Sequence, residues 1–375
     1  MTKKLPHYRF QGYTDAWELR KLGEVVYRSN LTSSSKDLPR LEFEDINSGL
    51  GTLNKDISQK VDDRKGLEFN EGDVLFGKLR PYLKNWWYAE FKGIALGDFW
   101  NLKSDLWHSC FLYTYIQSNS FQLVANDTSG TKMPRSDWNL VAESIAKFPS
   151  LPEQEAIGTF FSTLDRHITL HQRKLDTLKE QKKSYLKLLF PAKGQTKPAL
   201  RFQGFEDDWE EVKLGELCDI RTGKLDANAM VENGEYDFYT SGIKKYRIDV
   251  AEFEGPAITI AGNGATVGYM HLADGKFNAY QRTYVLTNFK VDRRYIFSEI
   301  AKKLPIKIQQ EARTGNIPYI VLSMLTELSI SLPSLPEQEA IGTFFQTLDQ
   351  EISQVEDKLA SLKEMKKTLL RKLFV

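Results

Sequence analysis

The stretch LPEQEAIGTFF at Leu151–Phe161 recurs letter for letter at Leu335–Phe345, an offset of 184 positions. A second repeat precedes each copy, RFQGYTDAWELRKLGE from Arg9 and RFQGFEDDWEEVKLGE from Arg201, at an offset of 192. The chain of 375 residues is therefore one unit written twice, and each copy is long enough to bury its own core. Because the frames match while the segments between them differ, the sequence predicts a device that reads two different things at a fixed separation.

Each copy of LPEQEAIGTFF opens a predicted helix of about 38 residues, which would span roughly 57 Å. Ser150 with Glu153, and Ser334 with Glu337, have the spacing of a capping box. Apolar residues then recur in alternating steps of four and three, which is typical of a coiled-coil seam. The seam positions are Ile157, Phe161, Leu164, Ile168, His171, Leu175 and Leu178 in the first helix, and Ile341, Phe345, Leu348, Ile352, Val355, Leu359 and Leu362 in the second. A lone helix of this kind is marginal in water, so we expect the two to pair antiparallel.

The segments between the helices predict mixed domains. Strands are expected at Asp73–Lys78, Ile94–Leu102, Ala257–Ala261 and Thr283–Phe289, and helices at Ser104–Asn126 and Asp292–Ala312, the latter interrupted by Pro305. The expected divisions are a globular domain with an N-terminal arm at 1–149, a long helix at 150–192, a second globular domain at 193–333 and a second long helix at 334–375. The predicted fold class is α+β, with two globular domains in a pseudo-twofold arrangement separated by an antiparallel coiled coil.

Composition narrows the class of protein. Hydrophobic residues make up 41% of the chain and charged residues 27%, which is typical of a globular protein and excludes a disordered one. A net charge of +1 neither indicates nor excludes nucleic-acid binding. The two cysteines lie in different halves and form no disulfide framework, and no signal peptide or membrane-spanning run is visible. We therefore expect a cytoplasmic protein with buried thiols and no membrane association.

Catalytic signatures are mostly missing. His167 and His171 have the i, i+4 spacing of a zinc helix, but the sequence HITLH lacks the glutamate base and His171 falls on the seam, where a polar residue can set the register opposite Leu359. There is no GxxxxGK[ST] loop, no Asp/Asn-Pro-Pro-aromatic motif and no evident triad. We expect no catalytic residue, no metal site and no cofactor in this chain.

The loop GNGATVG at Gly262–Gly268 has glycine spacing GxGxxxG instead of GxGxxG, and the following YMHLADGKF indicates a hairpin, not a helix. Two interpretations stay open. The loop is a tight turn between strands, or its backbone amides press against a phosphodiester.

Basic and aromatic residues interleave in loop-like stretches, which suits DNA binding because Arg and Lys grip guanine and phosphates while Asn and Gln grip adenine. Surface solvation alone explains many such clusters. Their positions favour DNA binding over simple surface solvation. At the 184 offset Pro134 matches Pro318, while the neighbouring side chains that could contact bases differ, as expected if each domain reads its own base sequence. The candidate DNA-binding residues are Lys78, Arg80, Lys84, Trp86, Thr131, Lys132, Arg135, Arg221, Thr222, Lys224, Thr240, Ser241, Lys244, Asn263, Thr266, Tyr280, Gln281, Arg282, Arg313, Asn316 and Tyr319.

In these motifs the chain resembles the specificity subunits of type I restriction–modification systems, along essentially its whole length. The resemblance rests on the two LPEQEAIGTFF helix starts, DVLFGKLRPYL at Asp73, GTKMPRSDW at Gly130 and GNGATVG…QRTYVL from Gly262. It implies two target recognition domains, each reading one half of a bipartite, asymmetric DNA site, with helices that set the gap. It also implies that two methyltransferase subunits dock on the helices and that endonuclease–translocase subunits join them. S-adenosylmethionine, Mg²⁺ and ATP would act on those partners, and this chain would be non-catalytic.

Phe160, Tyr185, Phe344 and Leu370 are surface seam positions not needed for the helix pair, and they are candidate docking residues for the methyltransferase. Core filling around the helix pair is the alternative. Two other classes of function compete with the DNA reader. One is a coiled-coil scaffold that binds only proteins, and the other is a stand-alone DNA-modifying enzyme.

Overall fold

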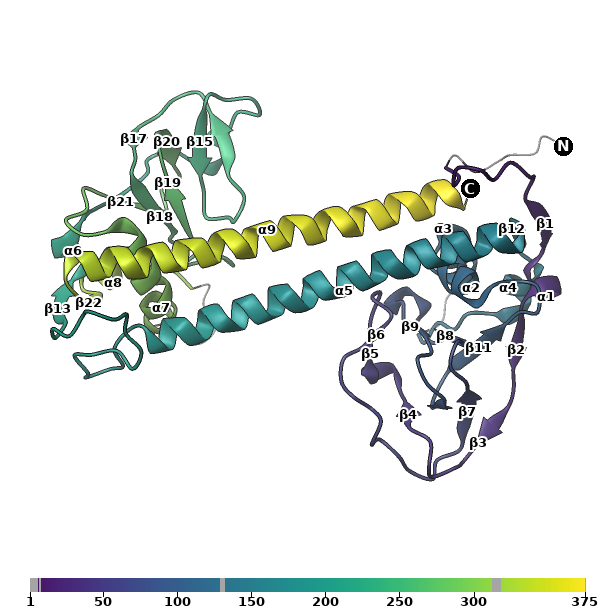
Figure 1. The fold of residues 1–375 in the computed structure, drawn as a ribbon. Helices are drawn as coiled ribbons and strands as arrows, with labels where there is room; N and C mark the ends of the chain where they lie inside the picture. The colour runs from purple at the N-terminus through teal and green to yellow at the C-terminus, as the bar shows by residue number, and fades with distance from the viewer. Residues whose placement is uncertain (1–5, 7, 129–131, 312–317, 375) are drawn as a thin grey trace. The chain divides into compact units, whose positions relative to one another are not determined.

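The computed structural model describes residues 6, 8–128, 132–311 and 318–374 (Figure 1). The chain divides into two compact units. Unit 1 contains residues 1–174 and 355–375, and unit 2 contains residues 175–354. Each unit therefore combines one globular domain with one part of each long helix, because the helices run in opposite directions.

The two long helices are α5 (Leu151–Leu188) and α9 (Leu335–Leu373), antiparallel in Figure 1. In unit 1 the Nζ of Lys366 lies 2.5 Å from Asp165, and in unit 2 the Nζ of Lys182 lies 2.5 Å from Asp349. These two ion pairs are the same pair at the 184 offset, so the register repeats. The apolar members of the predicted seam are buried, except that Leu348 is half-buried, as is His171.

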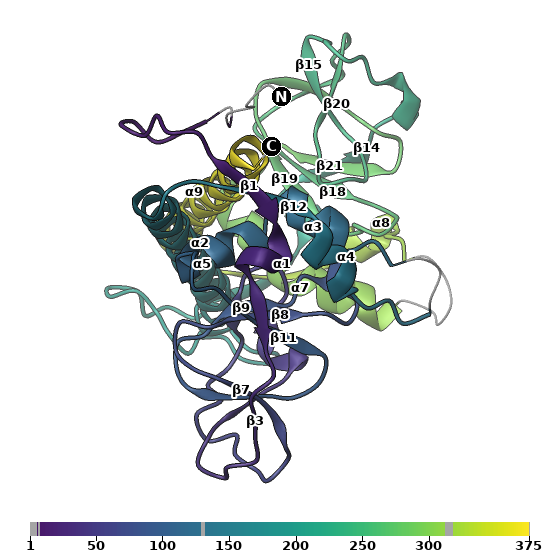
Figure 2. The same cartoon turned by 90° about the vertical axis from the view of Figure 1, so that its right-hand side faces the viewer.

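The globular part of unit 1 is built from short strands and helices. Its strands are β1 (Glu18–Lys21), β2 (Tyr27–Ser29), β3 (Thr32–Ser33), β4 (Arg40–Leu41), β5 (Ile46–Asn47), β6 (Thr52–Leu53), β7 (Gly66–Phe69), β8 (Val74–Gly77), β9 (Trp86–Tyr88), β10 (Gly93–Ala95), β11 (Phe99–Lys103) and β12 (Ile145–Phe148). Its helices are α1 (Leu22–Val25), α2 (Ser109–Ile116), α3 (Asn119–Ala125) and α4 (Trp138–Glu143), with 3₁₀ turns η1 (Phe43–Asp45) and η2 (Pro81–Leu83). The strands form sheets β2-β11-β8-β9 and β3-β7-β10-β4 and the pairs β1-β12 and β5-β6. Helix α2 packs on β8 and β9, and α4 contacts α1 and α3 (Figure 2).

Unit 2 repeats this plan. Its strands are β13 (Glu210–Lys213), β14 (Asp219–Thr222), β15 (Tyr236–Tyr239), β16 (Tyr246–Ile248), β17 (Phe253–Glu254), β18 (Ala257–Ala261), β19 (Met270–Ala273), β20 (Lys276–Ala279), β21 (Thr283–Thr287) and β22 (Ser329–Leu332). Its helices are α6 (Leu214–Leu217), α7 (Arg293–Glu311) and α8 (Leu322–Thr326), with η3 (Ala227–Ala229). Pair β13-β22 matches β1-β12, sheet β14-β21-β18-β19 matches β2-β11-β8-β9, and a second sheet runs β16-β15-β20-β17. Both units are α+β, as predicted.

The repeated LPEQ stretch has a structural explanation. Glu153 is fully buried, and its carboxylate accepts hydrogen bonds from Nε and Nη2 of Arg9 at 2.8 and 2.7 Å. Glu337 accepts the same two bonds from Arg201 at 2.7 and 2.8 Å. The arginine of each RFQG repeat thus clamps the start of the following long helix. The guanidinium groups are therefore long-range partners of these glutamates, and the capping boxes with Ser150 and Ser334 stay a prediction.

The neighbouring glutamine and glycine complete the same frame. Gln154 accepts from the amide of His108 at 2.9 Å and donates to the carbonyl of Pro149 at 2.9 Å. Gln338 bonds in the same way to Asp292 and Pro333, at 3.1 and 2.8 Å. A Cβ at Gly158 would lie 2.7 Å from the Cβ of Cys110, so only glycine allows the helix to approach α2 this closely.

Several element boundaries differ from the sequence predictions. The strand expected at Ile94–Leu102 is two strands, β10 and β11, separated by Gly97 at φ 95°. The helix expected at Ser104–Asn126 is α2 and α3, because the Ser118 side chain accepts from the amide of Phe121 and starts a new helix. Pro305 does not interrupt α7. It lies on the exposed face, where water can bind the carbonyl that proline leaves without a partner.

Candidate nucleic-acid interface and docking surface

In unit 2, the predicted DNA-binding loops lie together. Ser241 donates to Oδ1 of Asn263 at 2.6 Å, and the Thr266 hydroxyl donates to the carbonyl of Ser241. Asn263 also forms a β-bridge with Tyr319. These contacts join the loop after β15, the loop between β18 and β19, and the segment before α8. The side chains of Asn263, Thr266 and Ser241 are partly exposed, while Tyr319 is exposed, as a reading surface requires.

The loop after β20 belongs to the same surface. The amide of Tyr280 donates to Tyr239 at 2.8 Å, and the amide of Gln281 donates to Leu225 at 2.8 Å. Gly262 donates to the carbonyl of Arg282 at 2.8 Å. We call this assembly of 223–225, 240–242, 262–266, 280–282 and 318–320 the unit 2 loop surface. Sequence reasoning selected its segments separately, and the fold brings them together.

The corresponding place in unit 1 joins the loop after β8 to the segment before α4. Leu79 forms a β-bridge with Arg135, the counterpart at the 184 offset of the Asn263–Tyr319 bridge. The amide of Arg80 donates to Pro134 at 2.7 Å. The backbone connection is therefore conserved between the units, while the side chains it carries are different.

Some of the predicted DNA-binding cations are held in ion pairs within the protein, and others are not. Asp98 binds both Lys78, at 3.4 Å, and Arg135, at 2.9 Å, and Glu252 binds Lys224. Lys244 lies 5.5 Å from the ring centre of Tyr246. Within the described residues no ion pair is formed by Arg80, Lys84, Lys132, Arg221 and Arg282, all of which are exposed.

Some predicted contact residues need correction. Trp86 is 4% exposed and belongs to the core of unit 1, so it is not an exposed DNA-contacting ring. Trp86 follows a basic stretch in the sequence, but its strand, β9, faces the core. Thr131, Arg313 and Asn316 lie outside the described residues. The remaining candidates, Thr222 and Thr240, lie at the edges of the unit 2 loop surface, and Thr240 accepts from the amide of Gly242 at 3.4 Å.

Two basic residues of unit 1 adopt a backbone conformation that favours glycine. Arg80 has φ 49° and Lys84 has φ 57°. At the 184 offset they correspond to Gly264 and Gly268, with φ of 87° and 83°. A non-glycine residue in this left-handed region costs roughly 1–2 kcal/mol, and such strain is typical of functional positions. Unit 1 therefore retains two cationic side chains at positions where glycine would fit better.

Replacing Arg80 tests this interpretation. We expect Arg80→Gly to be more stable than Arg80→Ala by about 1 kcal/mol, because both variants lose the side chain but only glycine relieves the backbone. We expect both variants to weaken binding to duplex DNA to a similar extent. Thermal unfolding and a duplex-binding titration measure the two effects. Unchanged DNA binding in both variants would refute the contact, whatever their stability.

The GNGATVG loop connects β18 to β19, which pair antiparallel, so the loop is a turn between strands and no helix follows the glycines. Whether its amides also meet a phosphodiester stays a prediction. The hairpin expected within YMHLADGKF is wrong, because its two strands, β19 and β20, lie in different sheets. Nδ1 of His171 lies 2.8 Å from the carbonyl oxygen of His167, which can only accept, so the hydrogen bond is donated by the imidazole. No cluster of three metal-ligating side chains occurs within the part of the chain that the structure describes.

The thiols match the expectation in part. Cys218 is buried, and burial raises its pKa to about 12, which leaves the thiol unreactive at neutral pH. Cys110 is half-buried, against Gly158 of α5.

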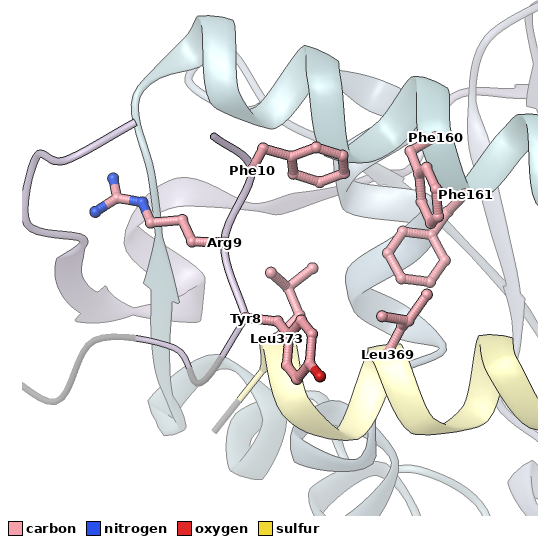
Figure 3. A pocket seen from close by; sticks show the side chains of 7 residues that line it. All are labelled: Tyr8, Arg9, Phe10, Phe160, Phe161, Leu369 and Leu373. Atoms are coloured by element: carbon pink, nitrogen blue, oxygen red, sulfur yellow. The ribbon is translucent and has the colours of Figure 1, made fainter. Parts of the chain in front are cut away.

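The predicted docking residues lie around the helix starts. In unit 1, Tyr8 and Phe10 of the N-terminal arm, Phe160 and Phe161 of α5, and Leu369 and Leu373 of α9 line an apolar cavity of about 140 Å³, and Arg9 turns its guanidinium away from it (Figure 3). Phe10 and Phe160 stand 5.5 Å apart between ring centres.

In unit 2, Tyr185 is the counterpart of Leu369 at the 184 offset. Its ring centre lies 5.0 Å from that of Phe344. Phe160 is 36% exposed, and Tyr185 and Phe344 are half-buried. Leu370 is 9% exposed and part of the core, so its assignment as a surface position is wrong. Docking through the other three stays a prediction.

Sequence reasoning missed one cationic row. Lys363, Lys367 and Arg371 are spaced four apart on α9, which places them on one face. That spacing was visible in the sequence, although basic residues near a helix C-terminus are also favoured by the helix dipole.

Comparison with known proteins agrees with this geometry. The family model of the type I restriction modification DNA specificity domain matches twice, at residues 14–180 and 206–364. The specificity subunit of the type I restriction enzyme EcoDI from Escherichia coli is 37% identical over 164 residues, which are 44% of this chain and 36% of that subunit. The MjaVIII specificity subunit from Methanocaldococcus jannaschii is 22% identical over 80% of this chain and 75% of its own length.

The crystal structure of the type I restriction–modification S subunit from M. genitalium has the same fold. It superposes with a TM-score of 0.73 at 18% identity and covers 99% of both chains. The chain belongs to the family of type I restriction–modification specificity subunits, with two DNA specificity domains. Within the described residues, no helix has the length and apolar character needed to cross a bilayer.

Proposed function

We propose that this chain is the non-catalytic DNA sequence-specificity subunit of a type I restriction–modification complex. Each recognition domain reads one half of a bipartite, asymmetric DNA site. The long helices set the unread gap between the halves and dock two methyltransferase subunits. Helix α5, with 38 residues, is about 57 Å long, which corresponds to about 17 base pairs.

The observation that carries the proposal is that the two units share the same backbone framework but present different side chains on their loops. The Arg9–Glu153 and Arg201–Glu337 clamps are the same, and so are the two β-bridges between the loops. The side chains on those loops differ, with Arg80 in one unit where the other has Gly264. A scaffold that only binds identical partners would need no such difference. Two readers of two unlike base sequences need it.

In this proposal, DNA methylation and DNA cleavage are carried out by the partner subunits and not by this chain. The proposed assembly contains two methyltransferase subunits, with S-adenosylmethionine, and endonuclease–translocase subunits, with ATP and Mg²⁺. Methylation of a base inside a duplex requires its extrusion, so the specificity subunit holds the DNA while the partner's pocket receives the base. The net charge of +1 fits a chain whose partners supply part of the phosphate grip, in the cytoplasm where the DNA lies.

Exchanging one recognition domain tests the proposal. We expect replacement of residues 18–149 by the matching segment of another family member to change one half of the methylated sequence and to leave the other half and the gap intact. The reciprocal exchange of 210–333 should change only the other half. Sequencing of methylated adenines in cells that express the complex provides the measurement.

The competing functions give different results in the same experiment. If the chain is a protein scaffold, both exchanges leave the methylated sequence unchanged. If it is a stand-alone enzyme, the purified chain modifies or cuts DNA without any partner. Either result would overturn the proposal.

A further inference from the structure

Unit 1 contains a basic groove between its globular domain and the helix pair. The cavity has a volume of about 880 Å³. One wall is the turn at Tyr82–Lys84 and another is the polar side of α3, with Asn119 and Gln122. The last turns of α9 form the third wall. All of these residues belong to unit 1.

The charge of this groove differs sharply from that of the chain. Lys84, Lys363, Lys366, Lys367 and Arg371 line it, and Asp165 is the acidic residue among the lining side chains. Lys366 lies 2.5 Å from Asp165 and donates to Gln117 at 2.6 Å, so this pair is internally neutral. Four cations remain in one groove of a chain whose net charge is +1. Such a concentration attracts a polyanion.

The four cations are held loosely enough to bind a ligand. Lys363 donates to the neutral Gln172 at 3.1 Å, and Lys367 lies 3.6 Å from Glu364 in a pair whose side chains are 76% and 66% exposed. Such an exposed pair contributes little and exchanges readily. Lys84 and Arg371 form no ion pair within the described residues.

The positions of these cations suit an extended phosphodiester chain. Lys363, Lys367 and Arg371 follow one another at about 6 Å along one face of α9. Opposite them, Lys84 keeps its left-handed backbone at φ 57° where unit 2 has Gly268. Tyr82 beside it is 56% exposed and offers a ring and a hydroxyl. The row of cations on α9 can bind phosphates, while Lys84 and Tyr82 on the opposite wall can fix the position of the phosphate chain.

We propose that this groove binds the phosphodiester backbone of duplex DNA adjoining the half-site read by the first recognition domain. The inference deepens the proposed function, because it assigns phosphate contacts to the end of α9 as well as to the recognition loops. These contacts are independent of base sequence. They hold the duplex in register while the loops of unit 1 read bases.

The test uses the complex assembled with methyltransferase subunits and the triple variant Lys363→Gln, Lys367→Gln, Arg371→Gln. We expect duplex affinity to fall at least about tenfold at moderate salt, equally for cognate and unrelated sequences. The slope of log K against log salt concentration should decrease by about 2 to 3, because about 0.9 counterions are released for each phosphate contact. The selected base sequence should not change.

A charge-matched control is available in the same unit. Lys36→Gln, Lys65→Gln, Lys92→Gln removes the same charge from exposed positions that do not line the groove. This control should leave the salt slope close to that of the wild type. Circular dichroism confirms folding of both variants, whose substituted side chains are all exposed.

Each other outcome decides against the groove as a DNA site. A triple variant with wild-type affinity and slope overturns it. So does a variant that assembles poorly with the methyltransferase but, once assembled, binds DNA normally, since the groove would then hold an acidic protein surface. If the wild-type complex itself binds no DNA, the proposed function fails, and the two failures are thereby distinguished.

Discussion

Lengthening both long helices by three heptads is expected to widen the unread gap by about nine base pairs, with both half-sequences unchanged. Duplicating Leu164–Ser184 in α5 and its counterpart Leu348–Thr368 in α9 adds 21 residues to each and continues the seam, because the duplicated segments face each other in the observed register. The added rise is about 32 Å, which equals about nine base pairs at 3.4 Å each.

Rotation must match as well as rise. A heptad falls about 20° short of whole turns of a straight helix, so three heptads rotate one end against the other by about −60°. Nine base pairs of a duplex with about 10.5 base pairs per turn rotate by about −50° relative to a full turn. Because the two rotations nearly match, both recognition domains of the lengthened variant can still face their half-sites on the same duplex.

An insertion of a single heptad in each helix is the matched control. It adds about 10.5 Å, or three base pairs, but three base pairs rotate the duplex by about 100°. The domains then lose their common phase, and we expect DNA binding to fall strongly. Equal binding by the one-heptad and three-heptad variants would show that the helices do not determine the gap.

Removing the carboxylate of Glu337 is expected to destabilise unit 2 by about 3 kcal/mol. Glu337 is 0% exposed and binds both Nε and Nη2 of Arg201, which is itself only 15% exposed. Glu337→Ala leaves that guanidinium without its acceptor at a mostly buried site, which is the costly way to break an ion pair. The unfolding midpoint of unit 2 should fall by about 6–12 °C. Hydrogen exchange should accelerate in the RFQG arm and in the first turns of α9.

Two companion variants isolate the cause. Glu339→Ala alters an exposed side chain of the same helix turn and should change stability by less than about 0.5 kcal/mol. The double replacement Arg201→Met, Glu337→Met removes both charges, and we expect it to recover most of the loss. If Glu337→Ala is as stable as Glu339→Ala, the clamp does not hold the helix start.

The sequence predicted the long helices well because their signals are local. Heptad spacing, a proline start and the exact repeat locate α5 and α9, and the apolar residues at that spacing are buried or half-buried. Strands β18 and β21 were also predicted closely, since apolar runs such as Ala257–Ala261 are fully buried. The α+β class followed from the same local patterns.

What the sequence could not provide depends on contacts between distant residues. The pairing of Arg9 with Glu153 spans 144 positions, and the spacing of Glu153 from Ser150 suggested a different, local partner. Trp86 looked exposed because it follows a basic stretch, yet its strand faces the core. The left-handed backbone of Arg80 is invisible in the sequence, and its glycine counterpart becomes meaningful only once the two units are aligned.

The most direct measurement is the sequencing of duplexes that the assembled complex selects from a random pool, performed with the wild-type chain and with the three-heptad variant. We expect the wild type to select two unlike half-sequences separated by one constant number of base pairs, and the variant to select the same halves about nine base pairs farther apart. A continuous site, a gap that varies among selected duplexes, or an unchanged gap in the lengthened variant would contradict a spacing fixed by the helices.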